Sequence, residues 1–423
     1  MQKILVEIWI PYGNTQVPMS IEIENLAAEV KPRNVRADGS DIESENKLEN
    51  RKDLRKLGEL VDQNDSIVIC VENFSPLLFS LIPIIKEIGN SDIKQSNVSV
   101  ILANNQNQKT SMDKSISLLL KEHDLGHISV LNHDPNSSEL TEVGSTSHGN
   151  KIHLNRKFMN SSFKICISQV RPHFMTGYSG IETLILPGLS STETALFNAK
   201  LSLHPDSRPG KLKGNPAYED SREAMDLAKV DYAVNLIPDT KMNLFEAFLG
   251  KPNEVLGKRT KFIENLYKIE IDKTSEVIIA SPGGDLFDNN LYDACDVLYN
   301  IYEIIKKGSV LILVSECMEG YGNSAFYDYM KKARNIKNSD LLKKAKKDFK
   351  LGYEKAHFLS ELNQRARIIL VSVMPDYYVR NVFGFKSAES ANDALKMAKR
   401  SIGGNYKGLV IPYGNLTIPK INK

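Results

Sequence analysis

Residues 66–103 read SIVICVENFSPLLFSLIPIIKEIGNSDIKQSNVSVILA and decide the fold class. Ser66–Val71 and Val98–Ala103 are short runs rich in Val and Ile, as expected of strands that are buried on both faces of a parallel sheet. The stretch between them, from about Leu77 to Ile88, has the length of a helix. A strand, a helix and a second strand in this order predict a βαβ unit and a parallel sheet.

The same alternation continues through the rest of the chain. The other strands expected before residue 270 are Ile128–Leu131, Phe163–Gln169, Thr183–Leu186 and Asp231–Pro238, and the helices are near Lys114–His123 and Glu219–Lys229. After about Ser275 the expected strands are Glu276–Ala280, Val310–Val314, Ile368–Val373 and Leu409–Ile411, and the helices are Asn290–Ile305 and about 388–401. We therefore predict an α/β fold of two α/β domains with largely parallel sheets, residues 1–270 and 271–423.

Composition and charge are those of an ordinary globular protein, with 41% hydrophobic residues, 25% charged residues and a formal net charge of +2. This balance predicts no nucleic-acid partner, and the lysine-rich stretch Lys331–Lys350 is typical of a solvated helical face. No apolar run approaches the roughly 18 residues of a membrane span. The four cysteines form no CxxC pair, and the N-terminal MQKILVEIWIPYG is typical of a strand, so we expect a reducing, cytoplasmic location.

Four segments carry the most specific signal. They are Arg171–Gly188 (RPHFMTGYSGIETLILPG), Arg208–Glu219 (RPGKLKGNPAYE), Ser281–Tyr292 (SPGGDLFDNNLY) and Glu316–Gly320 (ECMEG). In this order and spacing, over nearly the whole chain, they resemble the nickel-dependent lactate racemase family. The resemblance implies two α/β domains with the site in an interdomain cleft, and racemisation or epimerisation of 2-hydroxy acids. It also implies a nickel pincer on a pyridinium mononucleotide, often tethered to a lysine, and two histidines that exchange the proton.

The positions at which the family transfers the proton and binds substrate are mostly changed here. One catalytic histidine is retained as His173, ahead of a Gly-aromatic-Ser-Gly turn. Its partner position is Asn107, whose amide has no proton affinity near neutral pH, so two-base racemisation as in the family is not expected. The family's Asp-x-x-Arg-Pro type turn after the first strand reads Asn73-Phe74-Ser75-Pro76 here, and alignment on Pro76 puts Ser75 where the resemblance implies a substrate-binding arginine. Asn73, Ser75 and Asn107 remain candidates for contacts to a different ligand.

The positions that would hold the cofactor differ too. The tethering lysine is Thr183 here, and the nickel-ligating histidine is Ala199. A C-terminal helix that begins at Tyr292 carries Asp296 where the family has a lysine. We therefore expect no lysine-linked cofactor and assign no metal ligand, so the cofactor stays unknown. The weaker candidates for ligand or cofactor contacts are Asp293, Asp296, Thr183, Arg208 and Asn215.

These changes predict a site that is short of positive charge. Ser75, Thr183 and Asp296 stand where cations are expected, and Glu182 and Asp293 add carboxylates nearby. Two unit charges about 4 Å apart interact by roughly 4 kcal/mol at an effective dielectric constant of about 20. The cleft is therefore expected to reject lactate and an anionic mononucleotide. The cations that could compensate are Lys200, Arg208, Lys211 and Arg171.

Two histidine segments have both a functional and a structural interpretation. Asn132-His133-Asp134 follows a strand on the side of the sheet where α/β proteins bind ligands. His133 and Asp134 are therefore candidate ligand or metal contacts, or else residues of a surface turn. His173 is likewise either a base or metal ligand, or a polar residue that holds its loop through backbone hydrogen bonds.

Several segments of the C-terminal half are equally open to two interpretations. Ser281-Pro282-Gly283-Gly284 is a phosphate cradle or a tight turn, and Cys317 is a buried or a reactive thiol. A short repeat, IPYGNTQVP from Ile10 and IPYGNLTIP from Ile411, marks two similar turns or two loops that meet at the interdomain cleft. Four aspartates form a cation site or, through Asp288, a helix cap. They are Asp285, Asp288, Asp293 and Asp296.

Three functions fit these observations. The first is a divergent member of the family that binds or transforms a different small molecule in the cleft without the tethered pincer. The second is an active 2-hydroxy acid or sugar-acid racemase or epimerase, an isomerase, with relocated residues. The third is a non-catalytic binding protein. The sequence leaves open whether the chain is an enzyme and which oligomer it forms, and a small molecule is the expected partner.

Overall fold

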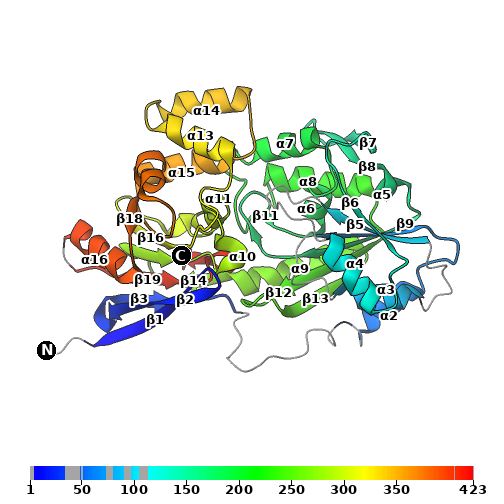
Figure 1. Ribbon diagram of the computed structural model, residues 1–423, viewed down its shortest axis with the longest axis horizontal. Helices are drawn as coiled ribbons and strands as arrows, with labels where there is room; N and C mark the ends of the chain where they lie inside the picture. Colours follow the sequence, from blue (N-terminus) through cyan, green and yellow to red (C-terminus); the bar gives the residue numbers. More distant parts are fainter. Residues whose placement is uncertain are drawn as a thin grey trace. The chain divides into compact units, whose positions relative to one another are not determined.

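The computed structural model describes residues 4–33, 48, 51–72, 80–89, 97–103, 113–403 and 405–422. The chain divides into two compact units (Figure 1). Unit 1 consists of Met1–Arg33, Arg208–Gly210 and Asn265–Lys423, and unit 2 consists of Asn34–Ser207 and Lys211–Glu264. Each unit contains one six-stranded sheet, as predicted for two α/β domains.

The sheet of unit 2 has the order β13-β12-β9-β4-β5-β6. Its strands are β4 (Ile67–Glu72), β5 (Val98–Ala103), β6 (Ser129–Asn132), β9 (Phe163–Gln169), β12 (Tyr232–Pro238) and β13 (Leu244–Gly250). All pairs are parallel except the one between β12 and the edge strand β13. Every residue of β5, β9 and β12 is buried, which explains why these strands are continuous apolar runs without alternation.

The side chains of successive residues of β4 point to opposite faces of this sheet. Ile67 and Ile69 pack in one apolar cluster with helices α2 (Lys52–Gly58), α3 (Leu81–Gly89) and α4 (Asp113–Glu122). Val68 and Cys70 pack in the other, with four helices on the opposite face. Those helices are α5 (Arg156–Asn160), α6 (Ile181–Ile185), α8 (Pro216–Ala228) and α9 (Pro252–Tyr267). Strands β7 (Leu140–Ser145) and β8 (Lys151–Asn155) form a separate antiparallel hairpin.

The sheet of unit 1 has the order β18-β17-β16-β15-β19-β3, and all its pairs are parallel. Its strands are β15 (Val277–Ala280), β16 (Val310–Val314), β17 (Arg367–Val371), β18 (Lys386–Ala388), β19 (Gly408–Ile411) and β3 (Leu26–Glu29). One face packs against helix α16 (Ala391–Ile402) and the hairpin of β1 (Leu5–Tyr12) and β2 (Thr15–Glu22). The helices on the other face include α13 (Ser324–Ala333), α14 (Asn338–Lys347) and α15 (Tyr353–Arg365).

The N-terminal segment Met1–Arg33 packs with the C-terminal block Asn265–Lys423. The two units therefore do not correspond to a single boundary in the sequence near residue 270. Strand β3 pairs with β19, and Ile8, Ile10 and Met19 of the hairpin are buried in the core of unit 1. This packing buries the apolar inner face of the hairpin against one face of the unit 1 sheet. Residues 1–270 and 271–423 remain a proposal for the division of the chain into domains.

Two predicted elements are wrong in type or in continuity. Thr183–Leu186 is the end of helix α6 and the residue after it, because that short helix is buried on nearly all sides and therefore shows no helical period. Asn290–Ile305 is not one helix. It is broken into α11 (Leu291–Ala294), α12 (Asp296–Asn300) and the 3₁₀ turn Tyr302–Ile304.

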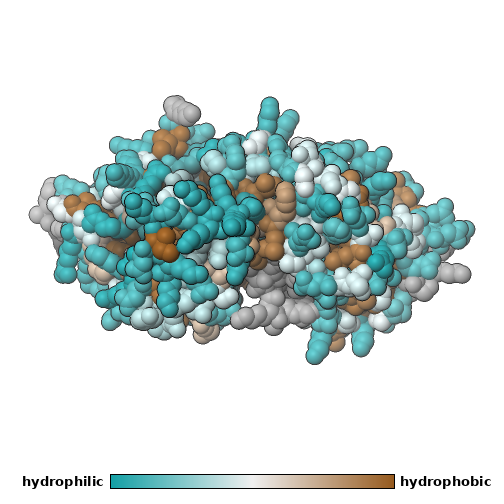
Figure 2. Space-filling model, turned by 90° about the horizontal axis from the view of Figure 1, so that it is seen from above, coloured by the Kyte–Doolittle hydropathy of each residue, from teal (hydrophilic) through white to brown (hydrophobic). Residues whose placement is uncertain are grey.

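Two features of the described residues bear on the predicted surface. No helix among the described residues is long and apolar enough to cross a bilayer. In α14, Leu341 and Ala345 are buried and the lysines lie outward, as predicted for a solvated face. Figure 2 shows several separate apolar areas among hydrophilic residues on the face in view. Scattered apolar side chains of this kind are normal on a protein surface.

Candidate functional site

The candidate site lies where the strand order of unit 2 reverses. The chain runs from β4 outward to β5 and β6, and then returns to form β9 and β12 on the other side of β4. In open α/β sheets, ligands bind outside the carboxyl ends of the strands at such a point. Here that point lies between the carboxyl ends of β4 and β9, so the first residues to consider are Glu72 and the segment Gln169–His173.

Glu72 is the last residue of β4 and the main residue that the sequence-based prediction missed. Its Oε2 accepts a hydrogen bond of 3.0 Å from the backbone N–H of Gln169, the last residue of the neighbouring strand β9. Burial raises the pKa of the Glu72 carboxyl, and the bond from Gln169 and the charge of Arg171 oppose this rise. The signal was present, because the Asp of an Asp-x-x-Arg-Pro turn lies four residues before its proline. With that proline at Pro76, the position is Glu72 and not Asn73.

His173 lies in a small hairpin that directly follows β9. Strands β10 (Pro172–His173) and β11 (Gly177–Tyr178) pair antiparallel, and the ring of His173 is half-buried. The backbone N–H of Thr176 donates to Nδ1 at 3.2 Å, and Oγ1 of Thr176 lies 2.9 Å from the same nitrogen. Because Nδ1 accepts, the neutral ring carries its proton on Nε2. The hairpin therefore fixes both the orientation and the tautomer of a potential proton-transfer group.

Gly177 keeps the hairpin close to the chain that follows it. Its φ of +83° lies in the region that favours glycine, and a Cβ there would be 2.2 Å from the carbonyl oxygen of Lys211. Asn215 joins the same parts, since its Nδ2 donates to the carbonyl oxygens of Met175 and Lys211 at 2.9 Å each. Its Oδ1 caps α8. Asn215 is fully buried, so these contacts give it a structural role; a role in holding a cofactor stays untested.

Thr183 is tied into the first turn of α6. Its Oγ1 accepts from the backbone N–H of Gly180 at 3.0 Å and donates to the carbonyl of the same residue at 2.9 Å. A threonine has no amine for a thioamide link, and this hydroxyl is used to cap its own helix. Ala199, on α7 (Thr192–Leu201), is buried and has no donor atom in its side chain. The side chains at these two positions therefore do not fit a lysine-tethered, histidine-ligated nickel group.

The negative charges predicted for Glu182 and Asp296 are each neutralised by an ion pair. Glu182 is paired with Arg259 of α9, with 2.5 Å between Oε1 and Nη2, and the side chains are 2% and 0% exposed. In unit 1, Asp296 is paired with Lys355 of α15, with 2.5 Å between Oδ1 and Nζ. Each carboxylate has its cation within the same unit. The predicted rejection of lactate therefore loses the unpaired negative charge of Glu182 and Asp296.

The cations proposed as compensating groups differ in their surroundings. Arg171 lies two residues after Gln169, and its charge opposes the rise in the pKa of the Glu72 carboxyl that burial causes. Arg208 belongs to unit 1 and is paired with Glu303 on the surface, and Lys211 is paired with Asp206. Of the cations with described partners, Arg171 is therefore the one placed at the candidate site.

His133 is a buried residue of the loop after β6. Asn155 Nδ2 donates to its Nδ1 at 3.2 Å, and its Nε2 lies 3.0 Å from the carbonyl oxygen of Ser190. Burial lowers the pKa of His133, so the neutral ring is favoured. Asp134 is exposed and accepts from the backbone N–H of Asn136 at 2.9 Å, as in an Asx turn. Both arrangements are those of a structural loop.

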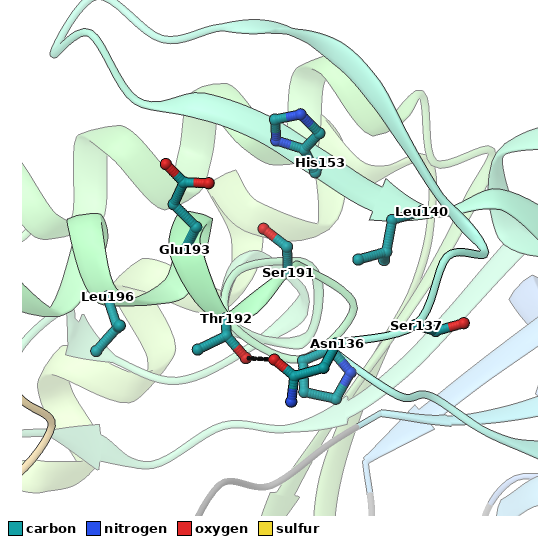
Figure 3. Close-up of a pocket in the computed structure, with 9 residues that line it drawn as sticks. Asn136, Ser137, Leu140, His153, Ser191, Thr192, Glu193 and Leu196 are labelled. Atoms are coloured by element: carbon teal, nitrogen blue, oxygen red, sulfur yellow. Dashed lines mark hydrogen bonds between the residues drawn. The ribbon is translucent and has the colours of Figure 1, made fainter.

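A shallow hollow of about 470 Å³ lies beside this loop (Figure 3). It is lined by Pro135, Asn136, Ser137, Leu140, His153, Ser191, Thr192, Glu193 and Leu196. Figure 3 shows Thr192 and Asn136 joined by a hydrogen bond, which is 2.8 Å long. Its loop follows β6, the edge strand two places from β4, so the hollow is away from the point where the strand order reverses. It contains none of the predicted site residues.

The two IPYGN turns meet in unit 1 at the Ser281–Gly284 turn. Ser281 donates from Oγ to the carbonyl of Pro11 at 2.6 Å, and its own carbonyl accepts from the N–H of Gly414 at 2.8 Å. Within the same turn, the Gly283 N–H donates to Ser281 Oγ at 3.1 Å. The chain's own turns thus occupy the reversal point between β15 and β19, which supports the tight-turn interpretation over a phosphate cradle. That these loops face an interdomain cleft stays a prediction.

The acidic residues and Cys317 of this region are structural in their contacts. Asp288 ends helix α10 (Asp285–Asp288) instead of starting a helix, and its Oδ2 accepts from the N–H groups of Gly13 and Glu316. The prediction of a cap was therefore wrong, because these partners are distant in sequence. Asp293 accepts from Asn290 Nδ2 at 2.8 Å. Cys317 is buried, which raises the pKa of its thiol to about 12, as expected of an unreactive cysteine.

Three predicted ligand contacts, Asn73, Ser75 and Asn107, lie outside the described residues. Within the described ranges, no group of three or more His, Cys, Asp and Glu side chains is arranged to hold a metal ion. What the structure does bring together in unit 2 is the His173 hairpin, the start of α6 at Thr183 and the start of α8 at Asn215. The candidate site is thus the region at the carboxyl ends of β4 and β9, with Glu72, Gln169, Arg171 and His173.

Two family models match the chain: the lactate racemase N-terminal domain over residues 12–210 and the lactate racemase C-terminal domain over residues 271–418. The lactate racemase of Thermoanaerobacterium thermosaccharolyticum is 24% identical over 97% of this chain and 98% of its own length. The lactate racemase of Lactiplantibacillus plantarum is 21% identical over 97% of this chain and 99% of its own length. These matches confirm the predicted family resemblance.

Solved structures confirm the predicted fold. The lactate racemase apoprotein from T. thermosaccharolyticum superposes with a TM-score of 0.86 at 23% identity, covering 98% of this chain and 100% of that one. A protein from Thermotoga maritima superposes with a TM-score of 0.67 at 16% identity, covering 92% of this chain and 100% of that one. At these identities the likeness concerns the fold and leaves the chemistry of the site to the residues present.

Proposed function

We infer that this chain, which belongs to the lactate racemase family, binds a small 2-hydroxy acid at the carboxyl edge of the unit 2 sheet and acts on it without a lysine-tethered nickel pincer. The observation that carries this proposal is the contrast between His173, retained and oriented by Thr176, and Thr183, whose hydroxyl caps α6 where the tethering lysine is expected. A proton-transfer group is kept while the anchor of the cofactor is absent.

Two side chains that follow β9, those of Arg171 and His173, are suited to a small carboxylic acid. Arg171 brings a guanidinium, the side chain best matched to a carboxylate because its donors form a planar fork. His173 brings an imidazole, the side chain that most often takes or gives a proton in general acid–base catalysis. The backbone of Arg171 is held by Ser179, which accepts from its N–H at 3.1 Å through Oγ and donates its own N–H to its carbonyl at 2.9 Å. Both groups are thus fixed to one hairpin.

The test is a binding titration of 2-hydroxy acids followed by NMR of the histidine ring protons. We expect at least one acid to bind with a Kd of about 1 mM or below, roughly 4 kcal/mol or more of binding free energy, and to shift the signals of His173. Conversion of that acid is expected to fall by about 10²–10⁴-fold in His173→Asn, the usual contribution of a general acid–base group. His204→Asn is the matched control, since His204 is an exposed surface histidine.

Two results would contradict the proposal. One is that no 2-hydroxy acid binds, which would favour the non-catalytic alternative. The other is that binding and conversion are the same in His173→Asn as in the unchanged chain. A racemase with a non-covalently held pincer would show itself differently, through nickel that remains bound to the chain during purification.

A further inference from the structure

We propose that Thr176 is a positioning residue for proton transfer by His173, because it offers the Nδ1 atom of the imidazole an acceptor as well as a donor. The inference deepens the proposed function and rests on it. Both residues belong to the small hairpin of β10 and β11, which follows β9. Thr176 acts on the ligand only through the ring of His173.

The donor is the backbone N–H of Thr176, which lies 3.2 Å from Nδ1. A backbone N–H can only donate, so this contact suits the neutral ring that carries its proton on Nε2. A histidine that takes or gives a proton also exists as an imidazolium, in which both ring nitrogens carry protons. In that state the N–H of Thr176 faces another N–H, and Nδ1 needs an acceptor instead.

The acceptor is the hydroxyl of the same residue. Oγ1 of Thr176 lies 2.9 Å from Nδ1 of His173, and it donates its own proton to the carbonyl of Tyr178 at 3.0 Å. A hydroxyl has one proton and two lone pairs, so the bond to Tyr178 leaves a lone pair for Nδ1–H. A hydrogen bond from a charged donor is roughly twice as strong as one between neutral groups. The hydroxyl therefore stabilises the imidazolium, whereas the backbone N–H stabilises the neutral resting ring.

Proton transfer at Nε2 depends on this hydroxyl. To take a proton from the ligand, Nε2 must be unprotonated, so the neutral ring must hold its proton on Nδ1. Transfer then gives the imidazolium, and the proton returns to the ligand from Nε2. Before and after transfer, Nδ1–H donates to Oγ1 of Thr176, and no proton leaves through Thr176. Without the hydroxyl, the backbone N–H would favour the tautomer that cannot take a proton at Nε2.

Burial and the anchoring of the hairpin hold Thr176 in place. Thr176 is fully buried, so water has no access to its hydroxyl. The carbonyl of Met175, before it, accepts from Asn215 Nδ2 at 2.9 Å, and Gly177, after it, packs against the carbonyl oxygen of Lys211. With both neighbours fixed, the two contacts to Nδ1 persist when the charge of the ring changes.

The experiment measures the kcat and the Kd for D-lactate and L-lactate in Thr176→Val and Thr176→Ser. Valine has the shape of threonine without the hydroxyl, so we expect kcat to fall by about 10–100-fold, as for a lost hydrogen bond to a charged group. The Kd should change by less than about threefold, and serine should return kcat to within about threefold of the unchanged chain.

Thr194→Val is the matched control. Thr194 is also buried, and its Oγ1 donates to the carbonyl of Lys151 at 2.7 Å, but none of its described contacts involves His173. Its kcat should stay within about threefold of the unchanged chain. Thr176→Ala, which lacks the hydroxyl as well, is the second variant in case valine hinders folding, and it should lose kcat to the same extent as valine.

The split between kcat and Kd separates positioning from support of the fold. An unchanged kcat in Thr176→Val and Thr176→Ala would overturn the inference, and so would a loss that serine does not restore. If His173→Asn loses conversion while the variants without the hydroxyl keep it, this inference is lost and the proposed function stands. If the unchanged chain converts neither enantiomer, both are lost.

Discussion

Replacing Arg259 with methionine is expected to lower the free energy of unfolding of unit 2 by about 3–5 kcal/mol, because the substitution leaves the carboxylate of Glu182 buried without its cation. The two side chains are 0% and 2% exposed, so water cannot take over the role of the guanidinium. Arg259 also donates to the carbonyl of Ser179 at 3.1 Å, within the segment that follows the His173 hairpin. The loss should therefore appear first in this segment.

The measurement is hydrogen–deuterium exchange of the β9 and α6 peptides, together with chemical denaturation followed by circular dichroism. The double variant Arg259→Met/Glu182→Met is the matched comparison, since an apolar pair of similar volume can replace a buried ion pair at little net loss. We expect it to be more stable than Arg259→Met alone. Independent, additive losses for the two substitutions would contradict the assignment of this contact as a coupled buried pair.

A second large effect is expected in unit 1 from Lys355→Met, at the lower end of about 3–5 kcal/mol. Lys355 is 1% exposed, and its Nζ meets Asp296 at 2.5 Å and donates to the carbonyl of Tyr292 at 3.0 Å. The ammonium also lies 4.2 Å from the centre of the Tyr292 ring. Asp296 is 19% exposed, so solvent can screen part of the charge left behind, which places the effect at the lower end.

Denaturation curves of Lys355→Met and of Lys343→Met give a direct comparison. Lys343 is 80% exposed and pairs with Asp340 on the surface of α14, so its replacement should change the free energy of unfolding by less than about 0.5 kcal/mol. Hydrogen exchange of the β15 and β16 peptides would locate the loss in unit 1. Equal stability of the two variants would show that the Asp296–Lys355 pair is not the stabilising contact described here.

The fold class could be predicted because its signal is local. Runs such as Ile67–Val71 and Val98–Ala103 are buried on both faces, and this alone requires continuous apolar sequence. The family could be predicted from ordered turns such as Gly177–Gly180, where close approach of the chain excludes a side chain. Thr183–Leu186 failed for the opposite reason, since a buried helix and a buried strand look alike over so short a stretch.

The partners of charged residues could not be predicted, because they come from remote parts of the chain. Glu182 and Asp296 were read as excess negative charge, whereas Arg259 and Lys355 neutralise them from helices that follow much later. Asp288 was expected to cap a helix and instead binds the N–H of Gly13, at the other end of unit 1 in sequence. Sequence spacing carries no information about such contacts, so the charge of the site required the structure.

Glu72 was missed for a simpler reason. The motif that contains it was aligned on Pro76 but started one residue late, so attention fell on Asn73. The structure corrects this because β4 ends at Glu72, next to the N–H of Gln169. His173 lies on the hairpin that follows β9, and its catalytic role stays a prediction.

The central claim is that the chain works without a lysine-tethered nickel pincer, and the most direct test is its nickel content and intact mass. The chain is produced in a host that makes the family's cofactor, beside the variant Thr183→Lys/Ala199→His, which introduces the lysine and the histidine that the family resemblance implies at these positions. We predict that the unchanged chain has the mass of its sequence, 47.4 kDa, with far less than one nickel per chain, and that the variant retains more. Nearly one nickel per unchanged chain, together with racemisation of lactate, would contradict the claim.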